Sequence, residues 1–140
     1  NNNIKIHATI GDENVYGTES EFSQIFLNLI TNSKDAFIDR DIKDREIHIT
    51  TLSKENYSVV IFEDNAGGIP KENLEKIFDP YFTTKEHSNG TGIGLYMSKI
   101  LVDKNMKGKL RVRNTNYGAK FAIFVPKNSD ENKEIKYEFI

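Results

Sequence analysis

Three amide and carboxylate side chains are spaced so that they would share one face of a helix. Asn28, Asn32 and Asp35 follow one another at i, i+4 and i+7. Exposed helix faces usually carry Lys, Glu and Arg, because asparagine is a mediocre helix former. An amide oxygen is a good hard ligand for Mg²⁺, which binds few protein groups and keeps its waters. The row therefore indicates a polar site at a helix–sheet seam, although a polar face with incidental asparagines would show the same pattern.

A second candidate site is the segment 64–70, which follows a nearly continuous apolar run at 57–62 after the single residue Glu63. An Asp at the end of a buried strand lies where ligands bind open sheets. The Asp64 carboxylate could accept a hydrogen bond from an exocyclic amine such as that of adenine, and Gly67 and Gly68 would let a planar ring approach the backbone. An ordinary strand-ending turn is the alternative interpretation.

A glycine-rich segment precedes a predicted helix. Gly90, Gly92 and Gly94 alternate with Thr91 and Ile93, so their backbone N–H groups could face phosphate oxygens at a helix N-terminus. The spacing matches neither the P-loop nor the dinucleotide-binding fingerprint. A glycine-rich loop is by itself a weak signal.

A fourth segment, 78–85, reads Phe-Asp-Pro-Tyr-Phe-Thr-Thr-Lys and leads into an unpatterned loop at 79–91. Lys85 could reach phosphates, and the aromatic residues could anchor a lid. An aromatic cluster packed under a loop would have the same sequence.

The elements that position these segments can be predicted from periodicity. Alternation from Ile4 to Ile10 predicts a half-buried strand, and a short strand is expected near 15–16. Thr18 and Glu21 form a capping box that opens a helix ending at about Asp39.

The rest of the chain continues this mixture of strands and helices. Ile47 and Ile49 mark a second strand, and the run at 57–62 predicts a central strand covered on both faces. Short helices are predicted at 71–78 and 95–104. The last two strands, at 110–113 and 120–125, suggest hairpin pairing, which favours an α/β two-layer sandwich with helices on one face of a mixed sheet.

The length, net charge and cysteine count of the chain exclude several classes of function. The chain has 140 residues, a net charge of −2 and no cysteine. The length predicts one domain. The polar stretch at 128–133 reads as a hinge, so the domain is expected at 1–127 and the hinge with a short tail at 128–140. The charge and the cysteine count exclude bulk adhesion to nucleic acid or acidic lipid, a disulfide scaffold and a cysteine nucleophile. No apolar run approaches the ~18 residues of a membrane span. Because the first residue is Asn, we expect a piece of a longer protein.

The four segments together, in this order, resemble the ATP-binding catalytic domain of sensor histidine kinases. That family belongs to the superfamily shared with DNA gyrase, the MutL mismatch-repair proteins and the ninety-kilodalton heat-shock chaperones. The resemblance covers Ile4 to Val125. It implies the Bergerat fold, a mixed and largely antiparallel sheet covered on one face by about three helices.

The resemblance also implies roles for individual residues. Asn32 would coordinate the Mg²⁺ that bridges the ATP phosphates, and Asn28 would line the phosphate pocket. Asp64 would accept from the adenine amino group above Gly68, and Lys85 would contact phosphate. The other positions implied for the ATP site are Asp35, Ile69, Phe78, Phe82, Thr84, Gly90, Thr91, Gly92, Ile93, Gly94, Leu95 and Ala119.

The sequence departs from the family pattern at three positions. Ala66 and Asn116 stand where the family usually has glycines, and Ala119 replaces a frequent threonine. An alanine methyl group is small, so we expect ATP binding to survive. The threonine's usual contact near adenine would be missing.

The residue at position 28 bears on the reaction. Hydrolytic members of the superfamily have Glu there, whereas an amide cannot take a proton from water, so Asn28 argues for a kinase. None of the histidines fits a phosphoacceptor, because His7 and His48 lie in strand patterns and His87 lies in the loop. The acceptor histidine is therefore expected on a separate dimerisation domain.

The resemblance implies a cytoplasmic domain of a homodimeric parent protein that serves a response regulator and makes no contact with nucleic acid or membrane. Two alternatives remain at this point. One is an ATP-hydrolysing conformational gate of the gyrase or chaperone type, and the other is a nucleotide-responsive binding module without transfer activity.

Overall fold

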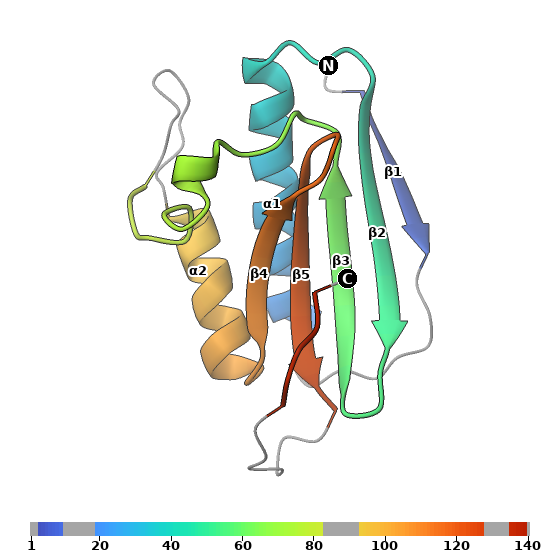
Figure 1. The fold of residues 1–140 in the computed structure, drawn as a ribbon, viewed down its shortest axis with the longest axis vertical. Helices are drawn as coiled ribbons and strands as arrows, with labels where there is room; N and C mark the ends of the chain where they lie inside the picture. The colour runs from blue at the N-terminus through green and yellow to red at the C-terminus, as the bar shows by residue number, and fades with distance from the viewer. Residues whose placement is uncertain (1–2, 10–18, 83–92, 128–134, 140) are drawn as a thin grey trace.

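Five strands form one mixed sheet in the computed structural model, which describes residues 3–9, 19–82, 93–127 and 135–139. The order across the sheet is β1-β2-β3-β5-β4. β1 pairs with β2 in parallel, and the other neighbours are antiparallel. The predicted mixed and largely antiparallel sheet is therefore confirmed (Figure 1). The strands are β1 (Ile4–Thr9), β2 (Arg45–Ser53), β3 (Tyr57–Asp64), β4 (Lys109–Asn114) and β5 (Ala119–Pro126).

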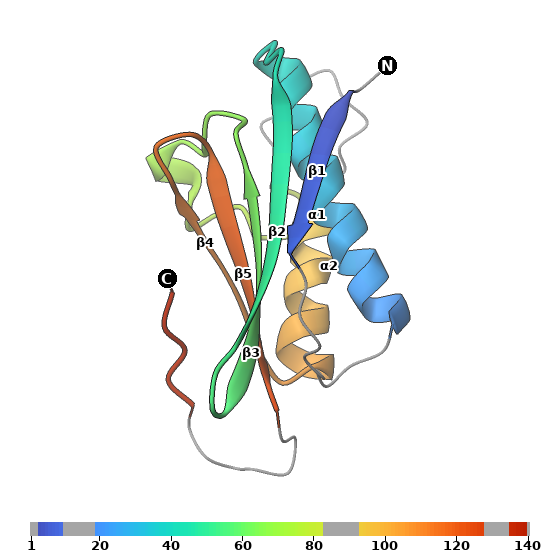
Figure 2. The same cartoon turned by 90° about the vertical axis from the view of Figure 1, so that its right-hand side faces the viewer.

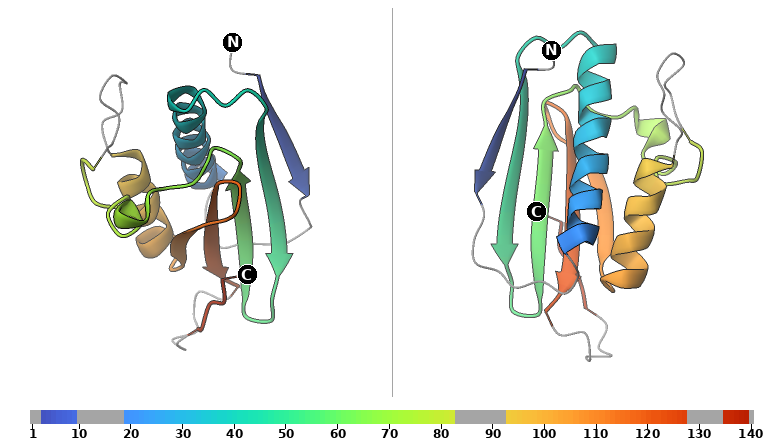
Figure 3. Two further views of the ribbon diagram at one scale, coloured as in Figure 1. Left: turned by 45° about the horizontal axis from the view of Figure 1, so that its top comes forward. Right: turned by 180° about the vertical axis from the view of Figure 1, so that it is seen from behind.

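Two helices cover one face of this sheet (Figure 3). α1 spans Glu19–Asp39, so its predicted end is confirmed, and α2 spans Gly94–Ile100 and continues into a π-helical turn, η2, at Leu101–Asn105. The buried stripe of α1 consists of Ile25, Leu29, Ser33 and Phe37. None of the helices in the described ranges combines the length and the apolarity that crossing a membrane requires.

The helix predicted at 71–78 is wrong in its extent. The structure has one turn of 3₁₀-helix there, η1, at Lys71–Asn73. The N–H groups of Asn73 and Leu74 bond to carbonyls three residues back, at 2.8 and 3.3 Å. Such bonds close tight turns and seldom extend beyond three or four residues.

β3 is the central strand that the apolar run predicted. It lies between β2 and β5, and all its residues except Glu63 are buried. β1, in contrast, lies at the edge of the sheet that the described residues form and has one neighbour there. Every residue of β1 after Ile4 is exposed, including Ile6 at 51%. The prediction of a half-buried strand was therefore wrong in burial but correct in type; Ile10 and the strand expected near 15–16 lie outside the described residues.

The last described segment, 135–139, packs on the face of the sheet opposite the helices (Figure 2). The ring of Tyr137 lies 4.9 Å from that of Tyr57 and 5.1 Å from that of Phe124, centroid to centroid. Both faces of the sheet therefore have an apolar cluster. The polar hinge predicted at 128–133 lies outside the described residues, as does the predicted N-cap at Thr18.

Candidate functional site

The carboxylate of Asp64 is buried at the end of β3, with 6% of the residue exposed. Its Oδ2 accepts a hydrogen bond from Ser33 Oγ at 2.7 Å. Its Oδ1 accepts from the backbone N–H groups of Ala66, at 3.0 Å, and Ala119, at 3.1 Å. These donors come from α1, the loop after β3 and the start of β5. A carboxylate offers about four acceptor positions, so this arrangement orients Asp64 and leaves capacity for one further donor.

Gly118 is required by the close approach of β5 to this carboxylate. A Cβ at position 118 would lie 2.1 Å from the backbone oxygen of Asp64 and 2.6 Å from its Oδ1. Neither distance is compatible with a side chain. Glycine is therefore required at position 118 because there is no room for a side chain.

The loop after β3 is held by the side chain of Asn114. Its Oδ1 accepts from the N–H of Ile69 at 2.8 Å, and its Nδ2 donates to the carbonyl of Ile69 at 2.7 Å. Gly67 and Gly68 have φ values of +96° and +85°, which favour glycine. A Cβ on Gly68 would also approach Asn114 Oδ1 to 3.0 Å. Position 68 therefore requires glycine for its positive φ, and Asn114 at the end of β4 holds the adjacent backbone in place.

The alanine that departs from the family pattern fits this loop. Ala66 is 1% exposed and packs in the core between the sheet and the helices. Its carbonyl accepts a hydrogen bond from Arg40 Nη1, beyond the end of α1. The additional methyl group is therefore accommodated in the core.

Asn28 joins α1 to α2. Its Nδ2 donates to the carbonyl of Gly94 at 3.0 Å and to Ser98 Oγ at 2.9 Å. Its Oδ1 accepts from Gln24 Nε2 at 3.1 Å. Both amide hydrogens are thus engaged at the start of α2, where the glycine-rich segment ends.

Asn32 lies one helical turn after Asn28 and is half-buried. Within the described part of the chain, its side chain makes no hydrogen bond, so its amide oxygen can accept a ligand. Asp35 is also half-buried. A single neutral oxygen donor fits Mg²⁺, which keeps several waters and takes few protein ligands.

Phe78 and Phe82 pack against the core between the sheet and the helices. The ring of Phe78 meets that of Phe121 edge-on, with centroids 6.3 Å apart and planes at 78°. Tyr81, between them, is 75% exposed and has a φ of +67°. The two phenylalanines are therefore anchored at the base of the segment predicted to form the lid.

Part of the predicted site cannot be placed. Thr84, Lys85, Gly90, Thr91 and Gly92 lie outside the described residues. The positions that follow are at the start of α2, where Gly94 is the first residue and Leu95 packs against the core. Ile93 occupies the N-cap position of that helix.

Residues 17–129 match the family described as histidine kinase-, DNA gyrase B-, and HSP90-like ATPase. The chain belongs to this family. Its curated relatives include the two-component sensor PprA of Pseudomonas aeruginosa, 35% identical over 115 residues, and the sensor kinase CckA of Brucella abortus, 33% identical over 124 residues. These matches cover 80% and 81% of this chain. The chain spans only 12% and 13% of those two proteins.

Solved structures show the same fold. The catalytic domain of histidine kinase ThkA is 27% identical, with a TM-score of 0.72, and the match covers 89% of this chain and 79% of that chain. The mycobacterial sensor histidine kinase MprB is 22% identical, with a TM-score of 0.73. That match covers 88% of this chain and 81% of the MprB chain. The fold is therefore that of a histidine kinase catalytic domain, as the motif order predicted.

Two residues of this ATPase-family site, Ser33 and Asn114, were not singled out from the sequence. Ser33 donates to Asp64, and Asn114 holds Ile69. A signal for Ser33 existed, because it interrupts the apolar stripe of α1 and a buried hydroxyl needs a partner. Asn114 gave no such signal, since its partner lies 45 residues away along the chain.

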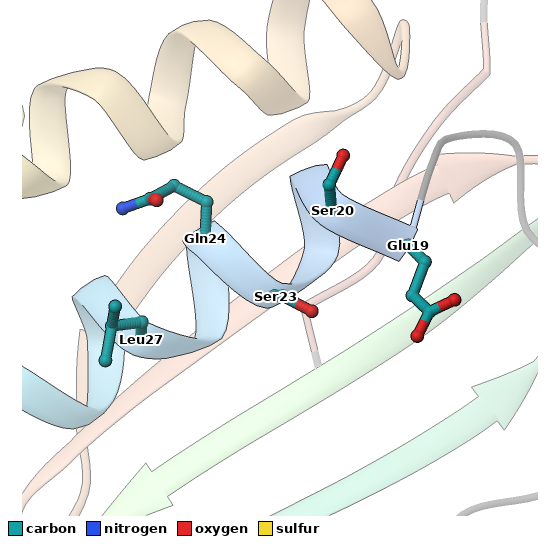
Figure 4. Close-up of a pocket in the computed structure, with 5 residues that line it drawn as sticks. All are labelled: Glu19, Ser20, Ser23, Gln24 and Leu27. Carbon is teal, nitrogen blue, oxygen red and sulfur yellow. The ribbon is translucent and has the colours of Figure 1, made fainter.

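A surface hollow lies on the first turns of α1 (Figure 4). Gln24 donates from this hollow to Asn28. Ser33, which contacts Asp64, is nine residues after Gln24 along the helix, or roughly 13 Å at 1.5 Å per residue. The hollow therefore adjoins the Asn28 end of the site and not the Asp64 end. Its lining consists of Glu19, Ser20, Ser23, Gln24 and Leu27.

Proposed function

We propose that this chain is the ATP-binding catalytic domain of a two-component sensor histidine kinase. It would bind Mg-ATP in the cytoplasm and transfer the γ-phosphate to a histidine on a dimerisation and phosphoacceptor domain outside this sequence. The parent protein would be a homodimer that passes the phosphate to a response regulator. The names of the relatives, a two-component sensor and a sensor kinase, support this proposal.

The observation that carries the proposal is the amide at position 28. Hydrolytic members of the superfamily have Glu there, and a carboxylate can accept a proton from water. Asn28 has no basic group, and its Nδ2 is occupied by Gly94 and Ser98. Phosphoryl transfer needs mainly positioning and charge stabilisation, which amides and backbone N–H groups can supply.

Adenine recognition is assigned to Asp64. Three donors already orient the carboxylate, and the adenine amino group would be the fourth. The left-handed backbone at Gly68 would lie beneath the ring, since no side chain stands there. A buried acceptor with fixed geometry discriminates strongly against bases that lack an amino group at this position.

The phosphates are assigned to the other end of the site. Asn32 would hold Mg²⁺ through its amide oxygen, and Lys85 would approach a phosphate. Bound Mg²⁺ supplies charge neutralisation on the phosphates. Asn28, through its bonds to Gly94 and Ser98, would set the position of the N-terminus of α2.

The test uses the chain alone and together with a separately produced phosphoacceptor domain. We expect calorimetry to show Mg-ATP binding, and we expect phosphate release by the chain alone to be far below 1 s⁻¹, since general-base assistance typically contributes 10²–10⁴-fold. With the acceptor domain, label from γ-³²P-ATP should appear in a linkage that is acid-labile and base-stable. Release at about 1 s⁻¹ or faster would instead favour the conformational gate, and binding without transfer would favour the nucleotide-responsive module.

A further inference from the structure

Two histidines and a glutamate meet near the edge of the sheet, on β1 and β2. The parallel register of β1 and β2 places His7 directly opposite His48. Glu46 is two residues before His48 in β2 and therefore points to the same face of the sheet. That face is opposite the one on which Ile47 is fully buried, so the three side chains lie on the side away from the helices.

The side chains already approach the geometry of a metal site. His7 Nε2 lies 2.9 Å from Glu46 Oε1. The rings of His7 and His48 are stacked, with centroids 4.5 Å apart and planes at 12°. One nitrogen or oxygen atom from each of the three residues lies within 4.8 Å of the others.

We propose that His7, Glu46 and His48 bind a divalent transition-metal ion of the Zn²⁺ type. Zn²⁺ takes imidazole nitrogen and carboxylate oxygen at about 2.0–2.2 Å, and three protein ligands leave a fourth position for water. Bonds of that length put tetrahedral ligand atoms roughly 3.3 Å apart. The side chains of His7 and Glu46 are 50% and 32% exposed, so they have room to rotate. Binding requires the two rings to leave their stacked arrangement, because the nitrogen lone pairs lie in the ring planes.

The ligand set separates this site from the magnesium of the nucleotide. Mg²⁺ prefers oxygen ligands in near-octahedral geometry, whereas imidazole suits Zn²⁺, Cu²⁺ and Ni²⁺. Two other charged residues lie opposite members of this cluster on the adjacent strands. Glu63 stands opposite His48 and is paired with Lys120 at 3.5 Å, and Lys5 stands opposite Glu46.

A bound ion would fasten β1 to the sheet. Among the strands of the described residues, β1 has β2 as its one neighbour, and its side chains are mostly exposed. A ligand from β1 and two from β2 on one ion would cross-link the two strands. The expected consequence is slower backbone exchange across Ile4–Thr9 when the ion is bound.

The test is a Zn²⁺ titration of the tag-free chain by calorimetry, without nucleotide. We expect His7→Ala and His48→Ala each to weaken binding at least tenfold, and the double variant to abolish it. His87→Ala, which alters the third histidine of the sequence, is the matched control and should bind as the wild type does. Equal affinity in the wild type and the double variant, or no saturable wild-type binding at millimolar Zn²⁺, would overturn the site.

Two further readouts distinguish Zn²⁺ binding at this cluster from nonspecific binding of Zn²⁺ to the protein surface. With Zn²⁺ at ten times its Kd, the wild-type Tm should rise by roughly 4 °C, and equal Mg²⁺ should leave it unchanged. Amide exchange within β1 should slow with Zn²⁺ in the wild type and stay unchanged in the His48→Ala variant, whose fold is checked by circular dichroism. An equal Tm rise in both proteins, or no slowing in wild-type β1, would contradict the proposal.

Discussion

Ser33 Oγ lies 2.7 Å from Asp64 Oδ2, and this contact joins the buried face of α1 to the end of the central strand. Ser33 is fully buried and Asp64 is 6% exposed. A hydrogen bond to a buried carboxylate contributes more than one between neutral groups. The contact therefore couples the stability of the helix–sheet packing to the orientation of the proposed adenine acceptor.

Ser33→Ala should lower the free energy of unfolding by about 1.5–3 kcal/mol, because it removes a donor to a charged buried acceptor. Urea unfolding measures this difference. Ser23→Ala is the matched control, because Ser23 is an exposed serine of the same helix, and it should stay within about 0.5 kcal/mol of the wild type. A loss no larger than that of the control would show that the contact does not hold Asp64.

Asp64→Asn should weaken ATP binding about tenfold or more, because the amide can present a donor toward the adenine amino group, and a hydrogen bond to a charged group contributes about 1.5–3 kcal/mol. Calorimetric titration of the folded variant measures the effect. Glu63→Gln is a suitable control, since Glu63 is the preceding residue of β3 and pairs with Lys120. Unchanged affinity for ATP in the Asp64 variant would refute the assignment.

Asn32→Ala should reduce nucleotide affinity when Mg²⁺ is present and change it much less in EDTA. The reason is that the proposed role of Asn32 is to hold the metal ion. Thr31→Ala, at an exposed neighbouring position of α1, should have little effect in either condition. If Asn32→Ala causes equal losses with and without Mg²⁺, the residue is structural and is not a ligand.

Gly118→Ala should destabilise the domain by at least about 1–3 kcal/mol, as overpacking does in a close-packed interior. Its Cβ would lie 2.1 Å from the Asp64 backbone oxygen, so β3 or β5 would have to move. Gly94→Ala is the contrasting variant for urea unfolding, because its Cβ would meet Asn28 at 3.7 Å, an ordinary contact. Equal stability of the two variants would contradict the predicted clash.

Docking of the segment 135–139 should weaken at high pH. Burial against the sheet raises the pKa of Tyr137 above its usual 10.0. The undocked tyrosine therefore ionises first, so docking is fully favoured below about pH 10 and weakens as the pH rises through the raised pKa. Nuclear magnetic resonance shifts of Phe139 between pH 8 and 11 measure it. Tyr137→Phe, which cannot ionise, should stay docked; identical profiles for both proteins would show another cause.

Local signals were sufficient for most of the elements and for the family. The helix predicted to end at about Asp39 is α1, and the apolar run predicted the central strand β3. The positions of Asn28 and Asp64, and the order of the motifs around them, identified the superfamily. These features could be read from the sequence because each depends on residues close together along the chain.

The tertiary structure alone decided which groups meet. Ser33 and Asp64 are 31 residues apart, Asn114 and Ile69 are 45 apart, and both pairs depend on the packing of whole elements. The exposure of β1 likewise follows from its edge position, which alternation of residue types does not encode.

His7 and His48 also show the difference between what local sequence predicts and what the tertiary structure decides. His7 and His48 were correctly predicted to lie in strands, yet they face each other because β1 and β2 pair in parallel at one particular register. A shift of that register by one residue would send one ring to the opposite face of the sheet. The sequence therefore determined the residue types and the strands, and the long-range register decided that they form a cluster.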